Sequence, residues 1–131
     1  MAKAKALIVD DDVTLRETLV ETFRGDGYEV EGAPDGETAL QLLDDTFDVA
    51  LVDLVLPGID GIETLRQAKQ KTDRCDIVMV TSHGAVETAV EAMRLGAADY
   101  ITKPVHPAAL LARMDRLLQQ RRLAGEVARL R

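Results

Sequence analysis

The sequence predicts an α/β domain in which helices cover both faces of a parallel β-sheet. Short apolar runs suited to buried strands alternate with longer segments whose apolar residues recur every three or four positions, as in helices. The connections are a few residues long, and such alternation requires right-handed crossovers between parallel strands. At 131 residues the chain has the length of one domain. We therefore expect a three-layer α/β sandwich of five strands and five helices.

Each strand is predicted from a short apolar run that ends at a polar residue or a turn. The third run is the most informative, because Val49 to Val52 are uninterrupted apolar residues, as in a strand buried on both faces. The second run alternates apolar and polar residues and is a weaker strand. The strands are expected at 7–9, 28–31, 48–52, 77–80 and around 100–101.

The helices are predicted from apolar spacing and from capping residues. Asp35 can cap the second helix, and Asp60 with Glu63 three residues later resembles a capping box for the third. A fourth helix is expected from about 86 to 95, and Pro107 suits the first position of the last one. The residues expected to face inward are Leu15, Leu19 and Phe23; Ala39, Leu42 and Leu43; Ile62 and Leu65; and Leu110, Met114 and Leu117.

The last helix is predicted to continue beyond the body of the domain. Leu123, Val127 and Leu130 form a second apolar seam that a domain of this size does not need. We expect residues 1–120 to form the domain and residues 121–131 to extend its last helix, as a linker or the start of a coiled coil.

Composition argues against several classes of partner. A net charge of -7, with two Phe, two Tyr and no Trp, disfavours nucleic acid and anionic membranes. No apolar run approaches the roughly 20 residues of a membrane span, and the N-terminal residues lack the apolar stretch of a secretory signal, so we expect a cytoplasmic protein. The single cysteine, Cys75, excludes an internal disulfide and a cysteine-based metal site, and we expect a buried thiol.

Four of the five predicted strands end at a polar or charged side chain. Asp10 and Asp11 follow the first strand, Asp53 the third, Thr81 the fourth and Lys103 the fifth. The carboxyl ends of parallel strands meet at one edge of a sheet, where ligands bind in open α/β folds. We therefore expect these side chains to share one crevice.

This combination predicts phosphoryl transfer to a carboxylate. Crowded carboxylates repel one another unless a cation lies among them, and Mg²⁺, which accepts one or two carboxylates and phosphate oxygens, fits better than Ca²⁺. Lys103 and the Thr81 hydroxyl would bind the phosphoryl oxygens, with an aspartate as nucleophile. Each residue taken alone has an ordinary interpretation. A strand-end aspartate usually caps a helix, as we expect for Asp12.

The segments LIVDDD, VALVDLVLPGIDG, VMVTSHG and ADYITKP resemble the receiver domain of two-component response regulators over residues 5–120. The resemblance implies a flavodoxin-like, doubly wound (βα)₅ fold with a parallel sheet of order 2-1-3-4-5. It also implies that Asp53 is the phosphoacceptor for a sensor histidine kinase. Asp11, Asp53 and the Val55 backbone carbonyl would ligate Mg²⁺ directly, and Asp10 would act through water.

The resemblance assigns further roles around the crevice. Thr81 would bind the phosphoryl oxygens in the active state, Lys103 would pair with them, and Tyr100 would be the aromatic side chain that turns on activation. The bond between Lys103 and Pro104 is typically cis in this family. His83 lies where family side chains influence the lifetime of the phosphate, although an exposed loop histidine is the plainer interpretation.

The stretch ETAVEAMRLGAADYITKP more narrowly resembles the receivers of NtrC-type sigma-54-dependent transcriptional activators, which precede an AAA+ ATPase domain. We expect a regulatory domain rather than an enzyme, either excised from a longer regulator or acting alone. A homodimer would form through the fourth helix, fifth strand and fifth helix, with the last helix contributing. The alternative is a single-domain response regulator that acts by protein–protein docking without a transcription output.

Three other functions fit the sequence less well. A phosphatase with an aspartate nucleophile would place an acidic general acid two residues after Asp53, where Val55 stands. A flavodoxin-like cofactor binder would need a phosphate-binding loop after the first strand, where three aspartates would repel a phosphate. A degenerate receiver that only docks is disfavoured by the intact site residues.

Overall fold

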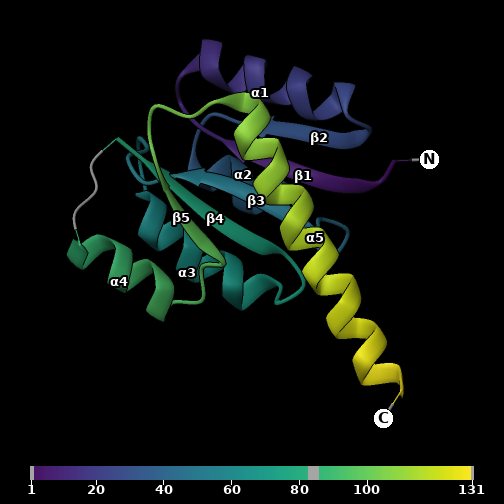
Figure 1. Ribbon diagram of the computed structural model, residues 1–131. Coiled ribbons are helices and arrows are strands. Elements are labelled where there is room, and N and C mark those ends of the chain that lie inside the picture. The colour runs from purple at the N-terminus through teal and green to yellow at the C-terminus, as the bar shows by residue number, and fades with distance from the viewer. Residues whose placement is uncertain (1, 83–85, 131) are drawn as a thin grey trace.

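A computed structural model describes residues 2–82 and 86–130, with side chains as far as residue 124, and shows the expected alternation of strands and helices (Figure 1). The elements are β1 (Ala4–Val9), α1 (Val13–Gly25), β2 (Tyr28–Ala33), α2 (Gly36–Leu42), β3 (Val49–Asp53), α3 (Gly61–Lys71), β4 (Asp76–Thr81), α4 (Val86–Arg94), β5 (Asp99–Thr102) and α5 (Pro107–Leu130).

The strands form one sheet in the order β2-β1-β3-β4-β5, and every neighbouring pair is parallel. All five residues of the central strand β3 are buried, as its uninterrupted apolar run predicted for a strand covered on both faces. The edge strand β2 alternates, with Tyr28 and Val30 buried and Glu29 and Glu31 exposed. The predicted fold class and strand order are confirmed.

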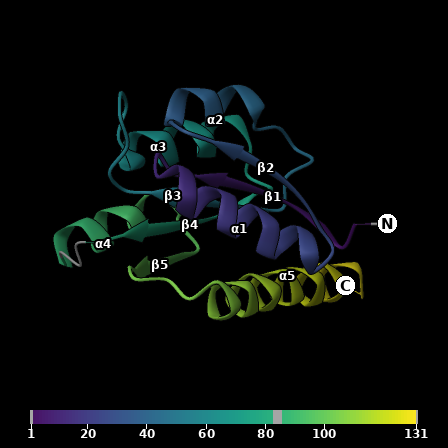
Figure 2. The same cartoon turned by 90° about the horizontal axis from the view of Figure 1, so that it is seen from above.

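Helices cover both faces of the sheet, which gives three layers. In Figure 2, α1 and α5 lie on one side of the sheet, and α2 and α3 lie on the other. The first pair packs against a core that includes Leu19, Phe23 and Met114. The other core includes Leu65 of α3 and Ala92 of α4, which places α4 on the same face as α2 and α3. The sheet therefore presents an apolar surface to helices on either side, while its strand ends remain open.

Aspartates cap the first three helices as predicted. The carboxylates of Asp12, Asp35 and Asp60 each accept a hydrogen bond from the backbone N–H three residues later, at 3.1, 2.7 and 2.8 Å respectively. Such a bond satisfies a donor that the helix itself leaves unpaired. The short connections after β1, β2 and before α3 are thereby ordered by local side chains.

The last helix leaves the body of the domain at its C-terminal end. Up to residue 124, where side chains are described, its buried residues are Leu110, Met114 and Leu118, so the inward stripe runs at intervals of four. Leu117, which we expected to face inward, is only partly buried. Leu123 is 55% exposed. The yellow end of α5 extends past the sheet in Figure 1. The side chains of Val127 and Leu130 lie outside the described residues. Across the described part of the chain, no helix is long and apolar enough to cross a membrane.

Candidate functional site

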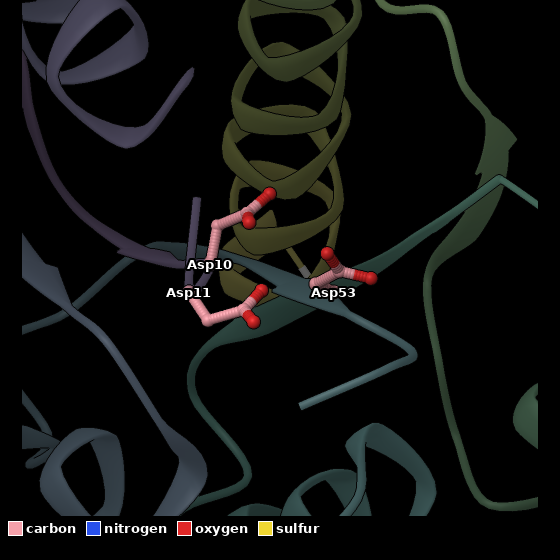
Figure 3. Close-up of side chains that lie close together, drawn as sticks. All are labelled: Asp10, Asp11 and Asp53. Atoms are coloured by element: carbon pink, nitrogen blue, oxygen red, sulfur yellow. The ribbon is translucent and has the colours of Figure 1, made fainter. Parts of the chain in front are cut away.

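Three carboxylates gather at the C-terminal edge of the sheet. Asp10 and Asp11 follow the last residue of β1, and Asp53 is the last residue of the neighbouring strand β3. Each of the three residues has a carboxylate oxygen that lies within 4.8 Å of those of the other two (Figure 3). Asp10 and Asp53 are only 4% and 6% exposed, whereas Asp11 is exposed. The predicted acidic crevice is therefore present, with two buried members and one open to solvent.

Lys103 reaches this crevice from the far side of β4. Its ammonium Nζ donates to Asp53 Oδ2 at 2.8 Å and to Asp10 Oδ2 at 3.2 Å. Its backbone N–H donates to the Thr81 carbonyl at 2.6 Å, which holds the connection after β5 against the end of β4. The Lys103–Pro104 peptide bond is cis, as the resemblance implied. The lysine thus joins the two buried carboxylates, although about 50 and 90 residues separate it from them in sequence.

The two buried carboxylates use their oxygens in the same way. Oδ1 of Asp10 accepts from the N–H of Asp12 at 2.9 Å, and Oδ1 of Asp53 accepts from the N–H of Val55 at 3.0 Å. In each residue the other oxygen, Oδ2, faces Lys103. The backbone bonds fix both carboxyl planes, so the orientation of these groups does not depend on the lysine alone.

Burial and charge act against each other on the buried groups. Burial raises the pKa of Asp10, with a further contribution from the Asp53 carboxylate, while the Asp12 N–H and the Lys103 ammonium oppose the rise. Burial disfavours the charged form of Lys103, but its hydrogen bonds to Asp53 and Asp10 outweigh burial and raise the pKa of Lys103. The lysine is therefore held as a cation.

A divalent cation fits the composition of this site. The cluster holds three carboxylates, and one ammonium pairs with two of them, so it carries excess negative charge when all three are ionised. All the available donors are hard oxygens, which suit Mg²⁺ or Ca²⁺ and not the softer metals. One carboxylate oxygen from each residue lies within 4.8 Å of the others, which is close enough for a shared ion. Asp10, Asp11 and Asp53 are the residues that could hold such an ion.

The other predicted residues lie around the crevice. Thr81 ends β4 and is completely buried; it lies one position beyond Val80, which pairs with Asp53. Tyr100 on β5 is partly buried against the core beneath α4. Val55 follows Asp53 by two residues and is 60% exposed. His83 lies outside the described residues.

One residue that supports the site was not expected from the sequence. Arg16 of α1 donates from Nη1 to the backbone carbonyl of Asp10 at 2.7 Å. It therefore helps to fix the end of β1, whose next residue is Asp11. An arginine in an amphipathic helix has no sequence signal for this role, because only the packing of α1 against β1 brings it to the strand end.

The fold and the crevice define a doubly wound α/β domain with an acidic cluster and a lysine at its strand ends, and the comparison with known families places it more narrowly. Residues 6–115 match the family described as the response regulator receiver domain. The chain belongs to this family. Its members are regulatory domains of two-component signalling systems, and the family is not one of catalytic enzymes.

Named relatives connect the family to transcription regulation. Transcriptional regulatory protein CpxR of Escherichia coli (strain K12) is 40% identical over 116 residues, which cover 88% of this chain and 50% of that protein. Regulatory protein AtoC of the same strain is 38% identical over 127 residues, covering 96% of this chain and 28% of that protein. The crystal structure of NtrX from Brucella abortus matches with a TM-score of 0.89 and 35% identity, over 100% of this chain and 30% of that one. The chain spans half or less of the length of these relatives, and AtoC and NtrX support the NtrC-type resemblance.

Proposed function

We propose that this domain is a phosphorylation-dependent switch in which Asp53 accepts a phosphoryl group from the phosphohistidine of a sensor histidine kinase. The observation that carries the proposal is the bridging ammonium of Lys103, which lies 2.8 Å from Asp53 and 3.2 Å from Asp10. A purely structural ion pair would need only one carboxylate for this lysine. Here the lysine is shared by two buried carboxylates beside a third, so its ammonium is placed where it could bind the oxygens of a phosphoryl group transferred to Asp53.

The transfer exchanges one bond to phosphorus for another. An Asp53 carboxylate oxygen attacks the phosphorus, an O–P bond forms, and the P–N bond to the kinase histidine breaks with its electron pair returning to the imidazole. Lys103 then pairs with the phosphoryl oxygens. Asp11, Asp53 and the Val55 carbonyl would hold Mg²⁺ directly, and Asp10 would hold it through water. The bound ion would supply positive charge that compensates the phosphoryl oxygens.

Mass spectrometry tests this assignment directly. Incubation with acetyl phosphate and Mg²⁺ should add about 80 daltons, the mass of one phosphoryl group, and chelation of Mg²⁺ should prevent the addition. Asp53→Asn should abolish it, whereas Asp73→Asn, an exposed control, should leave it intact. Lys103→Ala should slow it by roughly 100-fold, because one preorganised cation is lost from the transition state. An adduct that persists in the Asp53→Asn protein would exclude Asp53 as the acceptor.

We further propose that phosphorylation reshapes the surface formed by α4, β5 and α5. Thr81 would bind the phosphoryl oxygens, and Tyr100 would turn inward as the connection after β4 follows. The state favoured by phosphate must already exist as a minor population, because a ligand selects between conformations only through unequal affinity. The supporting observation is that α4 exposes Val86, Val90 and Met93, which are 73%, 44% and 49% exposed.

A second copy of this chain is the partner that we propose for that surface. Residues 1–120 would form the receiver, and residues 121–131 would contribute a linker or the first turns of a coiled coil, consistent with the exposure of Leu123 at the point where α5 leaves the body. Sedimentation at tens of micromolar should show more dimer with a beryllium fluoride phosphate mimic than without it. Equal sedimentation in the two conditions would count against the dimer.

The output is proposed to be transcription regulation. CpxR is named as a transcriptional regulatory protein and AtoC as a regulatory protein, and both are longer than this chain. A longer parent chain with an AAA+ domain would agree with the NtrC-type resemblance. The alternative, a single-domain regulator that acts by docking, would be favoured if the complete gene encoded no further domain.

A further inference from the structure

The connection between β3 and α3, residues 54–60, carries the backbone carbonyl of Val55 that the proposed function assigns to the metal. Its beginning is held by main-chain bonds. The N–H of Leu54 donates to the carbonyl of Val80 at 2.8 Å, and the N–H of Gly61 donates to the carbonyl of Leu54 at 2.9 Å. Beyond Leu54 the exposure is mixed: Val55 is 60% exposed and Pro57 and Gly58 are also exposed, whereas Leu56 is buried in the core. The Val55 N–H also donates to Oδ1 of Asp53 at 3.0 Å.

The far end of the connection is held from another element. Oε2 of Glu37, in the first turn of α2, accepts a hydrogen bond from the backbone N–H of Ile59 at 3.2 Å. Gly58 has a φ of +75°, and a Cβ placed there would lie only 2.9 Å from Oε1 of Glu37 and closer still to Oε2. The backbone conformation therefore favours glycine here, and any side chain at position 58 would also have to displace the flexible Glu37 carboxylate.

The first turn of α2 packs against the same segment. A Cβ added to Gly36 would lie 2.9 Å from Cγ1 of Ile59 and would collide with the Thr64 hydroxyl of α3. That hydroxyl itself donates to the carbonyl of Asp60 at 2.8 Å. The missing side chain at position 36 thus lets α2 approach closely enough for Glu37 to reach the Ile59 N–H. The close approach of Gly36 to Ile59 and that of Gly58 to Glu37 both lie beside the hydrogen bond between the Ile59 N–H and Glu37.

We infer that Glu37 is a positioning residue for the metal site, acting through the connection that presents the Val55 carbonyl. The inference rests on the proposed function, because it concerns how well Mg²⁺ is held beside Asp53. Glu37 lies outside the acidic crevice and would not contact the ion. Its contribution is to restrict the end of the 55–59 segment at Ile59, in addition to the main-chain anchors at Leu54 and the buried side chain of Leu56, so that the carbonyl is aimed before the ion arrives.

What matters at position 37 is a hydrogen-bond acceptor and not a negative charge. Glutamine keeps a carbonyl oxygen at the same reach, so Glu37→Gln should preserve the contact with Ile59, whereas Glu37→Ala removes it. Gly58→Ala provides a less specific second variant, because its methyl group meets the flexible Glu37 side chain and also strains a backbone with a φ of +75°. The part of its effect that acts through the Glu37 contact should not add to that of Glu37→Ala, whereas the part due to backbone strain should.

The experiment measures the loop and the metal site separately. Without metal, nuclear magnetic resonance of the full chain should show amide exchange at Ile59 that is about tenfold faster in Glu37→Ala and nearly unchanged in Glu37→Gln. Titration with Mg²⁺ should give a dissociation constant about three- to tenfold larger for Glu37→Ala and for Gly58→Ala, which is below or just at the lower limit of the effect typical for groups that contact metal ligands. Glu37→Gln should stay within about twofold of the unaltered chain. Glu21→Ala, an exposed change on α1, is the matched control.

The outcomes separate the inference from the function on which it rests. Loss of Mg²⁺ affinity in Glu37→Ala with rescue by Glu37→Gln, at equal unfolding midpoints, supports the positioning role. Unchanged Mg²⁺ affinity in Glu37→Ala, despite faster exchange at Ile59, overturns it and leaves the proposed function intact. An unaltered chain that binds no Mg²⁺ overturns the proposed function and the inference together.

Discussion

The neighbouring helices α3 and α4 lie on the same face of the sheet but are held very differently. In α3, Gly61, Thr64, Leu65 and Ala68 are buried, so one whole side of the helix packs against the core. In α4 the buried residue is Ala92, and the larger apolar side chains point outward. The strands beside them differ in the same sense, because every residue of β3 is buried whereas β5 has no fully buried residue.

This contrast separates the proposed acceptor from the surface proposed to respond to it. Asp53 stands at the end of β3, whose residues are all buried, so its position is firmly held, whereas Lys103 reaches it from the end of the less buried strand β5. The α4–β5 region has fewer buried apolar contacts, and regions of that kind open and shift at lower free-energy cost. Its exposed apolar side chains also make it the natural surface for a partner. The proposed switch therefore combines a phosphoacceptor on a firmly packed strand with a responding surface, formed by α4 and β5, that is weakly packed.

Thiol labelling should give the largest contrast between the two regions. Cys75, before β4, is 1% exposed, and burial raises its pKa to about 12, so its thiolate is scarce at neutral pH. A Met93→Cys change would place a second thiol on α4 at a position that is 49% exposed. Maleimide should label position 93 at least about a thousandfold faster than Cys75, because Cys75 reacts only through opening of the fold. Comparable rates would show that the contrast does not hold.

Truncation of one apolar side chain on α3 and one on α4 should lower the free energy of unfolding by very different amounts. Leu65→Ala removes a completely buried side chain and should lower the free energy of unfolding by about 2–5 kcal/mol. Met93→Ala on α4 should change it by less than about 0.5 kcal/mol, since half of that side chain is already in water. Urea unfolding measures both. A loss of 2 kcal/mol in Met93→Ala would mean that α4 is anchored as firmly as α3.

A charge on the exposed face of α4 should weaken the proposed dimer. Val90→Glu places a carboxylate at a position that is 44% exposed and apolar, and dimerisation in the presence of beryllium fluoride should weaken by about tenfold. Gln70→Glu adds the same charge to the exposed side of α3 and should have little effect. Sedimentation velocity distinguishes the two. Equal weakening by both variants would indicate a response to net charge and not to the α4 surface.

The smallest predicted effect concerns the free-energy cost of keeping the buried Asp10 carboxylate ionised at neutral pH. The pKa of Asp10 is raised in the fold above its ordinary value of 3.8, so the folded protein binds that proton more tightly than the unfolded chain does. The free energy of unfolding should therefore fall as the pH rises through the interval between these two pKa values, and the loss persists at neutral pH. In metal-free protein, Asp10→Asn should remove that cost and modestly raise the free energy of unfolding. Asp73→Asn is the control, and a destabilised Asp10→Asn protein in urea unfolding would contradict the prediction.

The sequence was most informative where local chemistry decides the structure. The aspartates at 12, 35 and 60 cap helices because a carboxylate three residues before an N–H can accept its bond without help from the rest of the fold. The buried strand before Asp53 could be recognised because a run covered on both faces contains no polar residue. Proximity at the strand ends then followed from parallel topology.

Other features could not be predicted from spacing. Leu117 and Leu118 both fit a helical stripe, and only the direction in which α5 crosses the sheet buries Leu118 more fully. Arg16 and Glu37 are ordinary charged residues of amphipathic helices until packing brings them to the carbonyl of Asp10 and the N–H of Ile59. The periodicity of α4 resembles that of a packed helix and does not reveal that its larger apolar side chains remain outside.

The sequence by itself determined the order of strands and helices, the capped helix starts and the residue types at the strand ends, because these depend on neighbours within a few positions. The tertiary structure decided which oxygen of each buried carboxylate faces Lys103, which helix is firmly packed and which remote side chains support the site. These features arise from contacts between segments tens of residues apart, whose distances and orientations are set only when the layers pack together.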